Sequence, residues 1–544
     1  MSELRLVPAA IVVWAAAVAC IVVGAWAGAA LVAVGAAACW LMGQAGQALL
    51  VAGLGAAATL TSGLRVRLAR AWELSGEVAG TISGQPRQTS AGGYLVRVAI
   101  DGHPTTTAVF TDTLPSGAVA GARVIARGRV GESGVIGVNP YTLDGSLEVI
   151  RPPTGLAAFA QHVRSTFAAS VNAHVGERAR GLIPGMVLGD VSAQNPQEQQ
   201  AYVDTGLSHL SAVSGSNVAI VTSFAVVAAA AVGLGLRGRL AVAAAALLIY
   251  AALVGPEPSV LRASVTGLVG LVAVLASRQS EPIHALCLAV IGLVLVDSDL
   301  AVHFGFVLSV AATAGIVALT PLLYRALAVT GWPDILVRAL AVAVAADAVT
   351  LPVVALMAGK VSLVSVAANV LVAPVTGPVT VLGLAAAALS LAPGGLEVVL
   401  LWVVEPLAAW VRVVAEFGAG MPFATIPATP VMAVLAYGWI IAGLLVRKPR
   451  LTAAAAIGVL FWCSRPPLGV GPPLDTSALR AHVVATTEDV EPVPPGTQLV
   501  VVLEDGAPHA RPVVTRSGVP VIYPNRDGDV TVLRDGTQRL PRAG

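Results

Sequence analysis

The chain has 544 residues, of which 56% are hydrophobic and only 11% are charged, and its mean hydropathy is +0.82. Soluble globular proteins carry about 25% charged residues, so this composition excludes a soluble enzyme, a disordered chain and a coiled coil. The formal net charge is +2, which gives none of the strongly basic character typical of nucleic-acid-binding domains. We therefore expect a polytopic membrane protein.

The N-terminal region, residues 1–71, is almost wholly apolar from Leu6 to about Leu64 and is interrupted only by Gln44 and Gln47. A helix needs about 20 residues to cross a bilayer, so this region predicts two or three crossings. Further apolar runs follow it, which favours membrane helices over a cleaved signal peptide.

Residues 72–151 change character. Short β-favouring runs at Tyr94–Ile100, Thr105–Phe110 and Arg123–Val130 alternate with turns rich in Gly, Pro, Ser and Asp. This pattern predicts a small all-β domain of about five strands.

Residues 152–204 form a linker that begins with a helical pattern. Apolar side chains recur at helical spacing at Leu156, Phe159, Val163, Phe167 and Val171. The pattern predicts an amphipathic helix lying on the membrane surface, and packing against the β domain would produce the same pattern.

Residues 205–463 are again dominated by apolar runs and predict about ten crossings, some of them short. Residues 464–544 are polar and Pro-rich, with strand-like pieces at Gln498–Leu503 and Val530–Arg534. The predicted fold class is a polytopic α-helical protein of about 12 to 13 membrane helices. It carries one small β domain and a short β-rich tail.

Loop charges predict the orientation, because cytoplasmic loops carry an excess of Lys and Arg. One arrangement puts the basic loops on the cytoplasmic side, and it leaves the β domain and the tail outside. Those loops contain Arg237 and Arg239, Arg278, Arg325 and Arg338, and residues 447–450. The N-terminus is then inside if the first region crosses three times, and Arg65, Arg67 and Arg70 lie outside against the rule.

Polar side chains gather within ten residues at the start of the second apolar region: Ser208, His209, Ser211, Ser214, Ser216 and Asn217. Lipid cannot hydrogen-bond them, so they are expected to face protein or a water-filled cavity. Helix–helix contacts alone would also explain the serines. We expect His209 and Asn217 to share one helical face.

A second group follows at Val254–Ala263, where Pro256 and Pro258 interrupt the helix. Arg262 lies just inside the next apolar run, and a charge deep in a bilayer costs about 2.5–3.5 kcal/mol. It is expected to pair with Glu257 or to extend to the membrane interface.

A third group lies farther along the chain and consists of Asp347, Lys360 and Asn369. We expect Asp347 to pair with Lys360, since charges within membranes tend to pair. The stretch after Asn369 contains Pro374, Gly377 and Pro378, and this predicts a discontinuous helix lining a cavity.

Four blocks of the sequence together resemble the ComEC-type competence protein family of inner-membrane DNA-uptake channels. They are GMVLGD with TGLSHLSAVSGSNVAIV, GPEPSVLRA, HFGFVLSVAATAGI, and LPVVALMAGKVSLVSVAANVLVAPV, in the family's order. The matching signature residues are Gly189, Asp190, Gly206 and Gly215. The resemblance implies that the β domain is OB-like.

The chain departs from this family in two respects. Many members have a histidine where this chain has Asn217, and many end in a metallo-β-lactamase-like nuclease domain. Such a site needs clustered metal ligands, whereas only His482 and His509 follow Cys463. The four cysteines lie in apolar runs without metal-binding spacing, and no Walker A loop is found. We therefore expect no enzyme activity, metal or cofactor.

The resemblance implies a channel that passes single-stranded DNA across the cytoplasmic membrane, with a helicase-like motor inside and a DNA receptor outside. The expected path residues are Ser208, His209, Ser211, Ser214, Ser216, Asn217, Glu257, Arg262, Lys360 and Asn369. In the β domain the expected DNA contacts are Arg123, Arg127, Arg129 and Tyr94, although acidic residues outnumber basic ones there. A secondary transporter for a small polar or anionic solute is the alternative, and an oligomer is compatible with the sequence.

Overall fold

The structure is a computed structural model that divides into two compact units, residues 1–453 and 454–544. In the first unit it describes residues 4–452 apart from positions 73, 90–91, 212, 277–280, 423, 447 and 449. In the second unit it describes 454–455, 458, 479–491, 493–494, 496–506, 513–515, 519–528, 531–532 and 538–539. Arg278, Arg447, Cys463 and His509, on which the sequence predictions drew, lie outside the described residues.

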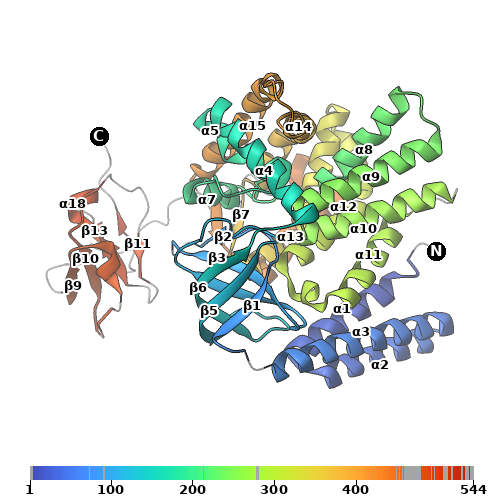
Figure 1. Cartoon of the computed structure of the whole chain (residues 1–544), viewed down its shortest axis with the longest axis horizontal. Coiled ribbons are helices and arrows are strands. Elements are labelled where there is room, and N and C mark those ends of the chain that lie inside the picture. The colour runs from blue at the N-terminus through green and yellow to red at the C-terminus, as the bar shows by residue number, and fades with distance from the viewer. Residues whose placement is uncertain are drawn as a thin grey trace. The chain divides into compact units, whose positions relative to one another are not determined.

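Three helices form the N-terminal region: α1 (Val7–Val22), α2 (Ala25–Leu41) and α3 (Ala45–Ala71). They are joined by short turns and pack side by side (Figure 1), and their buried residues share one hydrophobic cluster with residues of α11 (Pro282–Val296). Small residues permit the close packing, because a Cβ added at Gly55 would lie 2.7 Å from the Val32 side chain. Of the two numbers left open by the sequence, the structure shows three helices.

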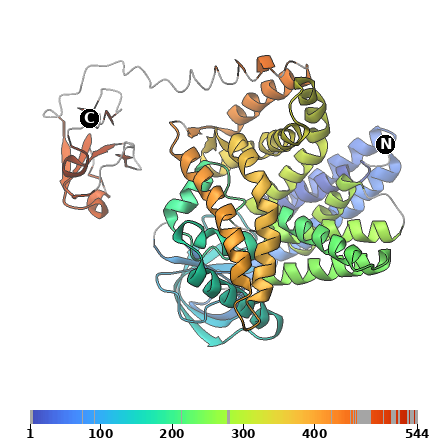
Figure 2. The same cartoon turned by 90° about the horizontal axis from the view of Figure 1, so that it is seen from above.

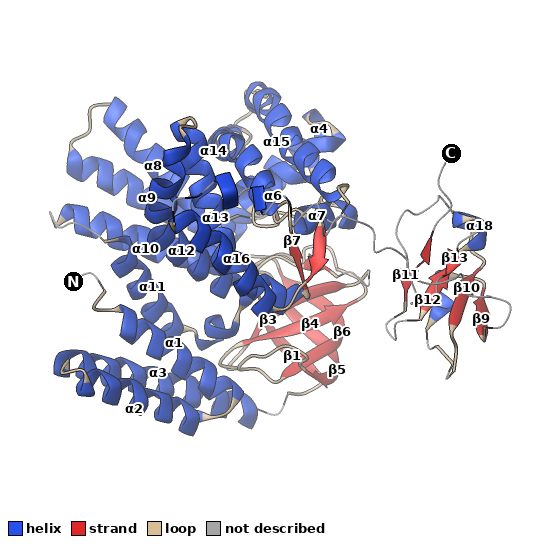
Figure 3. Ribbon diagram, turned by 180° about the vertical axis from the view of Figure 1, so that it is seen from behind, coloured by secondary structure: helices blue, strands red, loops and turns tan. Residues whose placement is uncertain are grey.

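A closed β-barrel follows α3 (Figure 3). Its strands are β1 (Glu77–Ile82), β2 (Arg87–Gln88), β3 (Tyr94–Ile100), β4 (Thr106–Thr111), β5 (Arg123–Glu132) and β6 (Tyr141–Arg151). The strand order is β1-β5-β6-β4-β3-β2, and a β1–β3 pairing closes five of the strands into a barrel. Gly128 lies opposite Gly145, and a Cβ on either would collide with the facing backbone, so these glycines let β5 and β6 approach closely. The predicted OB-like β domain is confirmed.

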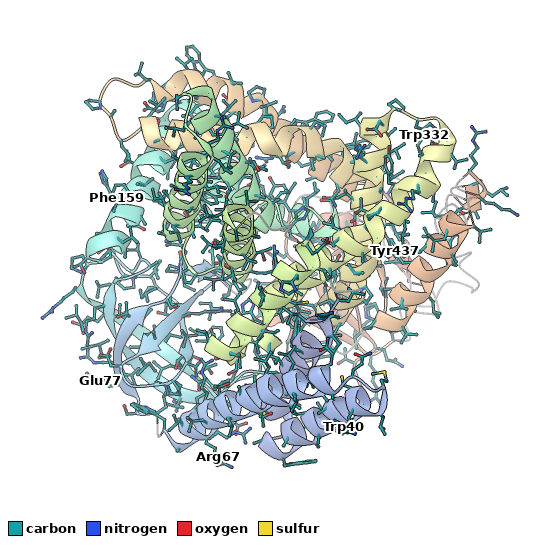
Figure 4. All side chains as sticks on the ribbon, turned by 90° about the vertical axis from the view of Figure 1, so that its right-hand side faces the viewer. Trp40, Arg67, Glu77, Phe159, Trp332 and Tyr437 are labelled. Carbon is teal, nitrogen blue, oxygen red and sulfur yellow. The ribbon has the colours of Figure 1, made fainter. Side chains whose placement is uncertain are left out.

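Four helices link the barrel to the membrane core: α4 (Gly155–His174), α5 (Glu177–Arg180), α6 (Leu182–Leu188) and α7 (Pro196–Asp204). Val163, Phe167 and Val171 of α4 are buried in a cluster shared with α6, α14 and α15, whereas Leu156 and Phe159 are 64% and 48% exposed. Figure 4 shows Phe159 on the outside of the molecule. The helix therefore packs mainly on other helices, with only its first turns presenting apolar side chains outward.

Arg164 of α4 is 5% exposed, although it carries a charge. Its Nη2 donates to the carbonyl of Leu253, in the last turn of α9. This contact caps a helix end that would otherwise present free carbonyls.

Replacing Arg164 with alanine is therefore expected to destabilise the fold by about 2–4 kcal/mol, since it removes a charged hydrogen bond and leaves a cavity. Thermal unfolding of the purified chain in detergent measures the loss. His162→Ala, at an exposed position on the same helix, is the matched control. Equal unfolding temperatures for the two variants would contradict the capping role.

The membrane core comprises α8 (Gly215–Ala231), α9 (Leu236–Val254), α10 (Pro258–Leu275), α11 (Pro282–Val296), α12 (Phe304–Leu327), α13 (Asp334–Ala358), α14 (Ser365–Leu389), α15 (Glu397–Ala419) and α16 (Pro430–Leu445). Short 3-10 turns η1 (Ser298–Val302) and η2 (Ala328–Thr330) flank α12, and strands β7 (Lys360–Ser362) and β8 (Thr425–Pro427) pair beside α13 and α16. Figure 2 shows these helices seen from above. Among the described residues, seven helices are long and apolar enough to cross a membrane and five shorter ones are also apolar. The polytopic fold is confirmed.

The predicted break in α14 is not observed. The helix runs from Ser365 to Leu389 through Pro374 and Pro378. Two prolines remove only two N–H donors, and membrane helices tolerate such losses because neighbouring groups satisfy the freed carbonyls.

The second unit contains a four-stranded sheet with the order β11-β12-β10-β9. Its strands are β9 (Ala481–Val484), β10 (Leu499–Val502), β11 (Val513–Val514) and β12 (Pro520–Ile522), and short elements η4 (Thr487–Val490), α18 (Pro524–Asp527), β13 (Thr531–Val532) and β14 (Gln538–Arg539) accompany them. Val500, Val502 and Tyr523 are buried in its small core. The predicted β-rich tail is confirmed.

Candidate nucleic-acid path

The N-termini of α8, α10 and α12 lie together at one end of the core. Ser259 Oγ, in the first turn of α10, donates to the carbonyl of Val213 just before α8, at 3.2 Å. Arg262 Nε, in the second turn of α10, donates to Ser309 Oγ in the second turn of α12, at 2.8 Å. A helix N-terminus carries unpaired N–H groups and about half a positive charge. Three of them at one place favour an anion.

Arg262 is 7% exposed and lies at the centre of this arrangement. Its Nη2 packs against Gly215, the first residue of α8, so closely that a Cβ at position 215 would overlap it. Among the described residues, Ser309 is the partner of the guanidinium and no carboxylate pairs with it. The expected pairing with Glu257 is wrong, because Glu257 forms an ion pair with Arg87 of the barrel at 2.8 Å.

The described residues of the polar segment before α8, 205–211 and 213–214, are not helical. Gly206 has φ +69°, and His209 Nδ1 donates to its carbonyl at 3.1 Å. Ser214 ends the segment as the N-cap of α8. His209 and Asn217 therefore do not share a helical face, since the helix begins only at Gly215.

The serines of this segment are exposed or half-buried. Ser208 and Ser216 are exposed, and Ser211 and Ser214 are half-buried. Ser214 Oγ and Ser216 Oγ lie 2.5 Å apart at the start of α8. The hydroxyls of Ser214 and Ser216 lie at the N-terminus of α8, on which Arg262 packs.

Asn217 is buried, and its Nδ2 donates to the carbonyl of Met186 in α6 at 2.8 Å. It joins α8 to α6, which is a structural contact. The signature residue Gly189 ends α6 with φ +77°, and Asp190 Oδ1 accepts from the Ser192 N–H at 3.0 Å in a turn. Gly206 packs on Ser365, whose Cβ would lie 2.8 Å from a Cβ at position 206.

Lys360 and Asp347 are not paired with each other. Lys360 Nζ lies 2.8 Å from Oδ1 of Asp204, a carboxylate that is 5% exposed. Asp347 accepts hydrogen bonds from Ser365 Oγ at 2.7 Å and from Tyr437 OH at 2.5 Å. Figure 4 labels Tyr437. The predicted Asp347–Lys360 pair is wrong, because each group finds a nearer partner on another element.

Asn369 lies in the second turn of α14, and its Nδ2 donates to the carbonyl of Ser365 at 3.0 Å. Asn369 is half-buried, and this hydrogen bond is local to the helix.

Two of the barrel arginines expected to touch DNA are held by acids. Arg123 pairs with Asp101, and Arg127 pairs with Glu148 at 2.7 Å and with Glu77 at 3.1 Å. Both hydrogen-bonded carboxylates raise the pKa of Arg127, Glu77 most strongly. Arg129 is exposed, and Tyr94 is half-buried where β3 pairs with β2 and β4.

Sequence reasoning missed Arg87 and Arg97, the barrel arginines that face the core. Arg97 Nη2 lies 3.2 Å from Nε2 of His303, the residue before α12. Alternation along β3 places Arg97 outside the barrel, but no sequence signal tells which outer face the core covers.

No curated protein and no solved structure matches the chain. The model of the family described as "Competence protein" matches residues 186–450. That span holds Arg262, the polar segment before α8 and the three gathered helix N-termini. Over this core, which is just under half of the chain, the sequence matches the competence protein family of membrane DNA-uptake proteins.

Proposed function

We propose that the chain provides the route by which single-stranded DNA crosses the cytoplasmic membrane. The observation that carries this proposal is Arg262, a buried guanidinium within the apolar core that no described carboxylate neutralises. A buried cation beside three helix N-termini is costly unless an anion visits it. A DNA strand brings one phosphate per nucleotide, and the family match ties this chain to DNA uptake.

The proposed lining is the polar segment around the N-terminus of α8. Ser208, His209, Ser211, Ser214 and Ser216 offer hydroxyl and imidazole groups to a passing strand. Hydrogen bonds from neutral hydroxyl and imidazole groups are weak enough to form and break as the strand moves. Conduction requires such weak, repeated binding. Farther along, Lys360 and Asn369 extend the polar lining at the start of α14, and Asn217 supports it from behind.

The orientation in this proposal puts the barrel and the tail outside the cell. In the first unit, the described basic loops lie at the ends of helices opposite the barrel: Arg237 and Arg239 begin α9, Arg325 ends α12, and Arg338 begins α13. Figure 4 shows Trp40 and Trp332 on the side away from Glu77 of the barrel, and such exposed indoles are typical of a membrane interface.

Arg65 is one of three exceptions to the charge rule, with Arg67 and Arg70, and its contacts explain why it is tolerated. It lies 2.7 Å from Asp297 and 3.6 Å from Asp299, so its charge is compensated on the barrel side. The driving force would come from a cytoplasmic helicase-like motor, and an extracytoplasmic receptor would deliver DNA.

Deleting the gene is expected to abolish the pool of fluorescent DNA that becomes protected from nuclease inside competent cells. Complementation with the wild-type gene should restore it. Unchanged uptake after deletion, in cells shown to import DNA, would overturn the proposal and favour a transporter for a small polar or anionic solute.

A further inference from the structure

The barrel is fixed on the core at two places. At the first, Asp299 of η1 accepts from Thr105 Oγ1 and from the Val138 N–H, both at 2.7 Å. Arg65 of α3 donates to the Pro104 carbonyl at 3.0 Å while pairing with Asp297. These contacts hold the barrel in one orientation and bring the β2–β3 edge over the helix starts.

At the second place the contacts involve the N-caps of two core helices. Arg87 of β2 pairs with Glu257, the N-cap of α10, and Arg97 of β3 faces His303, the N-cap of α12. Both arginines are exposed. The two helix N-termini add partial positive charge beneath them. Glu257, which is 38% exposed, pairs with Arg87, and both Glu257 and Asp299 act electrostatically on Arg97.

The hydrogen bonds of His303 leave its Nε2–H facing another donor. Its Nδ1 accepts from the Gly305 N–H at 3.1 Å, so a neutral imidazole carries its proton on Nε2. That N–H then faces the guanidinium of Arg97 at 3.2 Å, donor against donor. An acceptor shared by the two groups would satisfy both, and the two non-bridging oxygens of a phosphodiester, which share one negative charge, suit two donors.

The charges around His303 keep it neutral near pH 7. Partial burial and the facing Arg97 lower the pKa of His303, and Arg87 acts in the same direction. Glu257 and Asp297 act against this shift. The donor conflict is therefore present under physiological conditions.

We propose that the contact surface between the β2–β3 edge of the barrel and the N-caps of α10 and α12 is a phosphodiester-binding entrance, in which the Glu257 carboxylate occupies the place of a phosphate until DNA displaces it. The proposal rests on the function proposed above and names its first binding position. Arg97, Arg87 and the His303 Nε2–H bind the phosphate. Glu257 precedes Arg262 by five residues on α10, about 7.5 Å along the helix axis, so the strand passes from one cation to the next.

The occupancy by Glu257 makes a specific prediction. Glu257→Gln removes the competing charge and frees Arg87, so single-stranded DNA is expected to bind about two- to fivefold more tightly, the range in which exposed ion pairs fall. Arg97→Gln is expected to weaken binding and to flatten the slope of log K against log salt by about 0.7, one phosphate contact on a single strand.

The measurement uses the purified full chain in uncharged detergent and a fluorescent oligothymidylate, titrated at several salt concentrations. Glu132→Gln and Arg151→Gln, at exposed barrel positions away from the entrance, are the matched controls and should leave affinity and slope unchanged. With an oligonucleotide that has a neutral methylphosphonate backbone, neither Glu257→Gln nor Arg97→Gln should change the binding affinity. Phosphatidylglycerol, as a source of lipid phosphate, should not displace the DNA.

Three outcomes would overturn the entrance. They are no DNA binding by the wild-type chain, entrance variants that behave like their controls, and displacement of DNA by phosphatidylglycerol from the wild type but not from Arg97→Gln. If uptake is lost on deletion while any of these holds, the entrance fails and the proposed function stands. If uptake survives deletion, the proposed function itself fails.

Discussion

Charge reversal at Arg262 is expected to lower DNA uptake about a hundredfold or more, because like charges placed side by side cost several kcal/mol and each 1.4 kcal/mol is a factor of ten. The glutamate of Arg262→Glu would stand where the structure holds a buried guanidinium bonded to Ser309. Each passing phosphate would then meet an anion. The measurement is the nuclease-protected pool of internal fluorescent DNA, normalised to the amount of protein in the membrane.

Two milder variants separate charge from position. Arg262→Lys keeps the charge but loses the planar fork, so an intermediate uptake is expected. Ser309→Ala removes the oxygen that accepts from Arg262 Nε, and a smaller loss is expected because the charge remains. Normal uptake with Arg262→Glu at normal protein levels would remove Arg262 from the path.

The second large effect is expected at Gly215. A Cβ at this position would overlap Nη2 of Arg262 and would lie 3.3 Å from Cβ of Ala263. Overpacking of this kind costs about 1–3 kcal/mol, so Gly215→Ala should lower thermal stability and displace the guanidinium. Uptake is expected to fall about tenfold, which corresponds to 1.4 kcal/mol within that range.

A double-mutant cycle tests whether the cost arises from Arg262. In an Arg262→Ala background the overlap disappears, so Gly215→Ala should lower the free energy of unfolding only slightly. The coupling free energy between the two substitutions is expected to be about 0.5–3 kcal/mol. Gly270→Ala is the matched control on α10, because a Cβ there meets nothing within 4 Å. An equal loss of unfolding free energy in the wild-type and Arg262→Ala backgrounds would show that Gly215 is not required for the close approach of Arg262.

The arrangement at Arg262 illustrates why part of the site was beyond sequence reasoning. The polar segment, the prolines before α10 and the buried arginine are visible in the sequence, because polar residues inside apolar runs are costly and stand out. The partners are not visible. Arg262 contacts Gly215 and Ser309, which are 47 residues distant in each direction. Glu257, five residues away, pairs instead with a barrel arginine 170 residues earlier.

The helix starts show the same limit on a smaller scale. Eight-residue spacing suggested that His209 and Asn217 share a helical face, but the positive φ of Gly206 and the N-cap at Ser214 delay the helix until Gly215. In α14 the opposite holds, since Pro374 and Pro378 are absorbed into a continuous helix. Whether a proline or glycine ends a helix therefore depends on whether tertiary contacts satisfy the backbone groups around it.

What the sequence determined by itself is the class of the protein and the order of its parts. Apolar runs long enough to cross a bilayer predict membrane helices, and segments of alternating apolar and polar residues between turns predict a β domain. Both patterns are local, because they depend on side chains that are close together in the sequence. Only the tertiary structure decided which barrel face covers the core and which charges meet. Arg97 and His303 are 206 residues apart, and such a pairing depends on how the barrel docks on the core, to which the contacts of Asp299 with Thr105 and Val138 contribute.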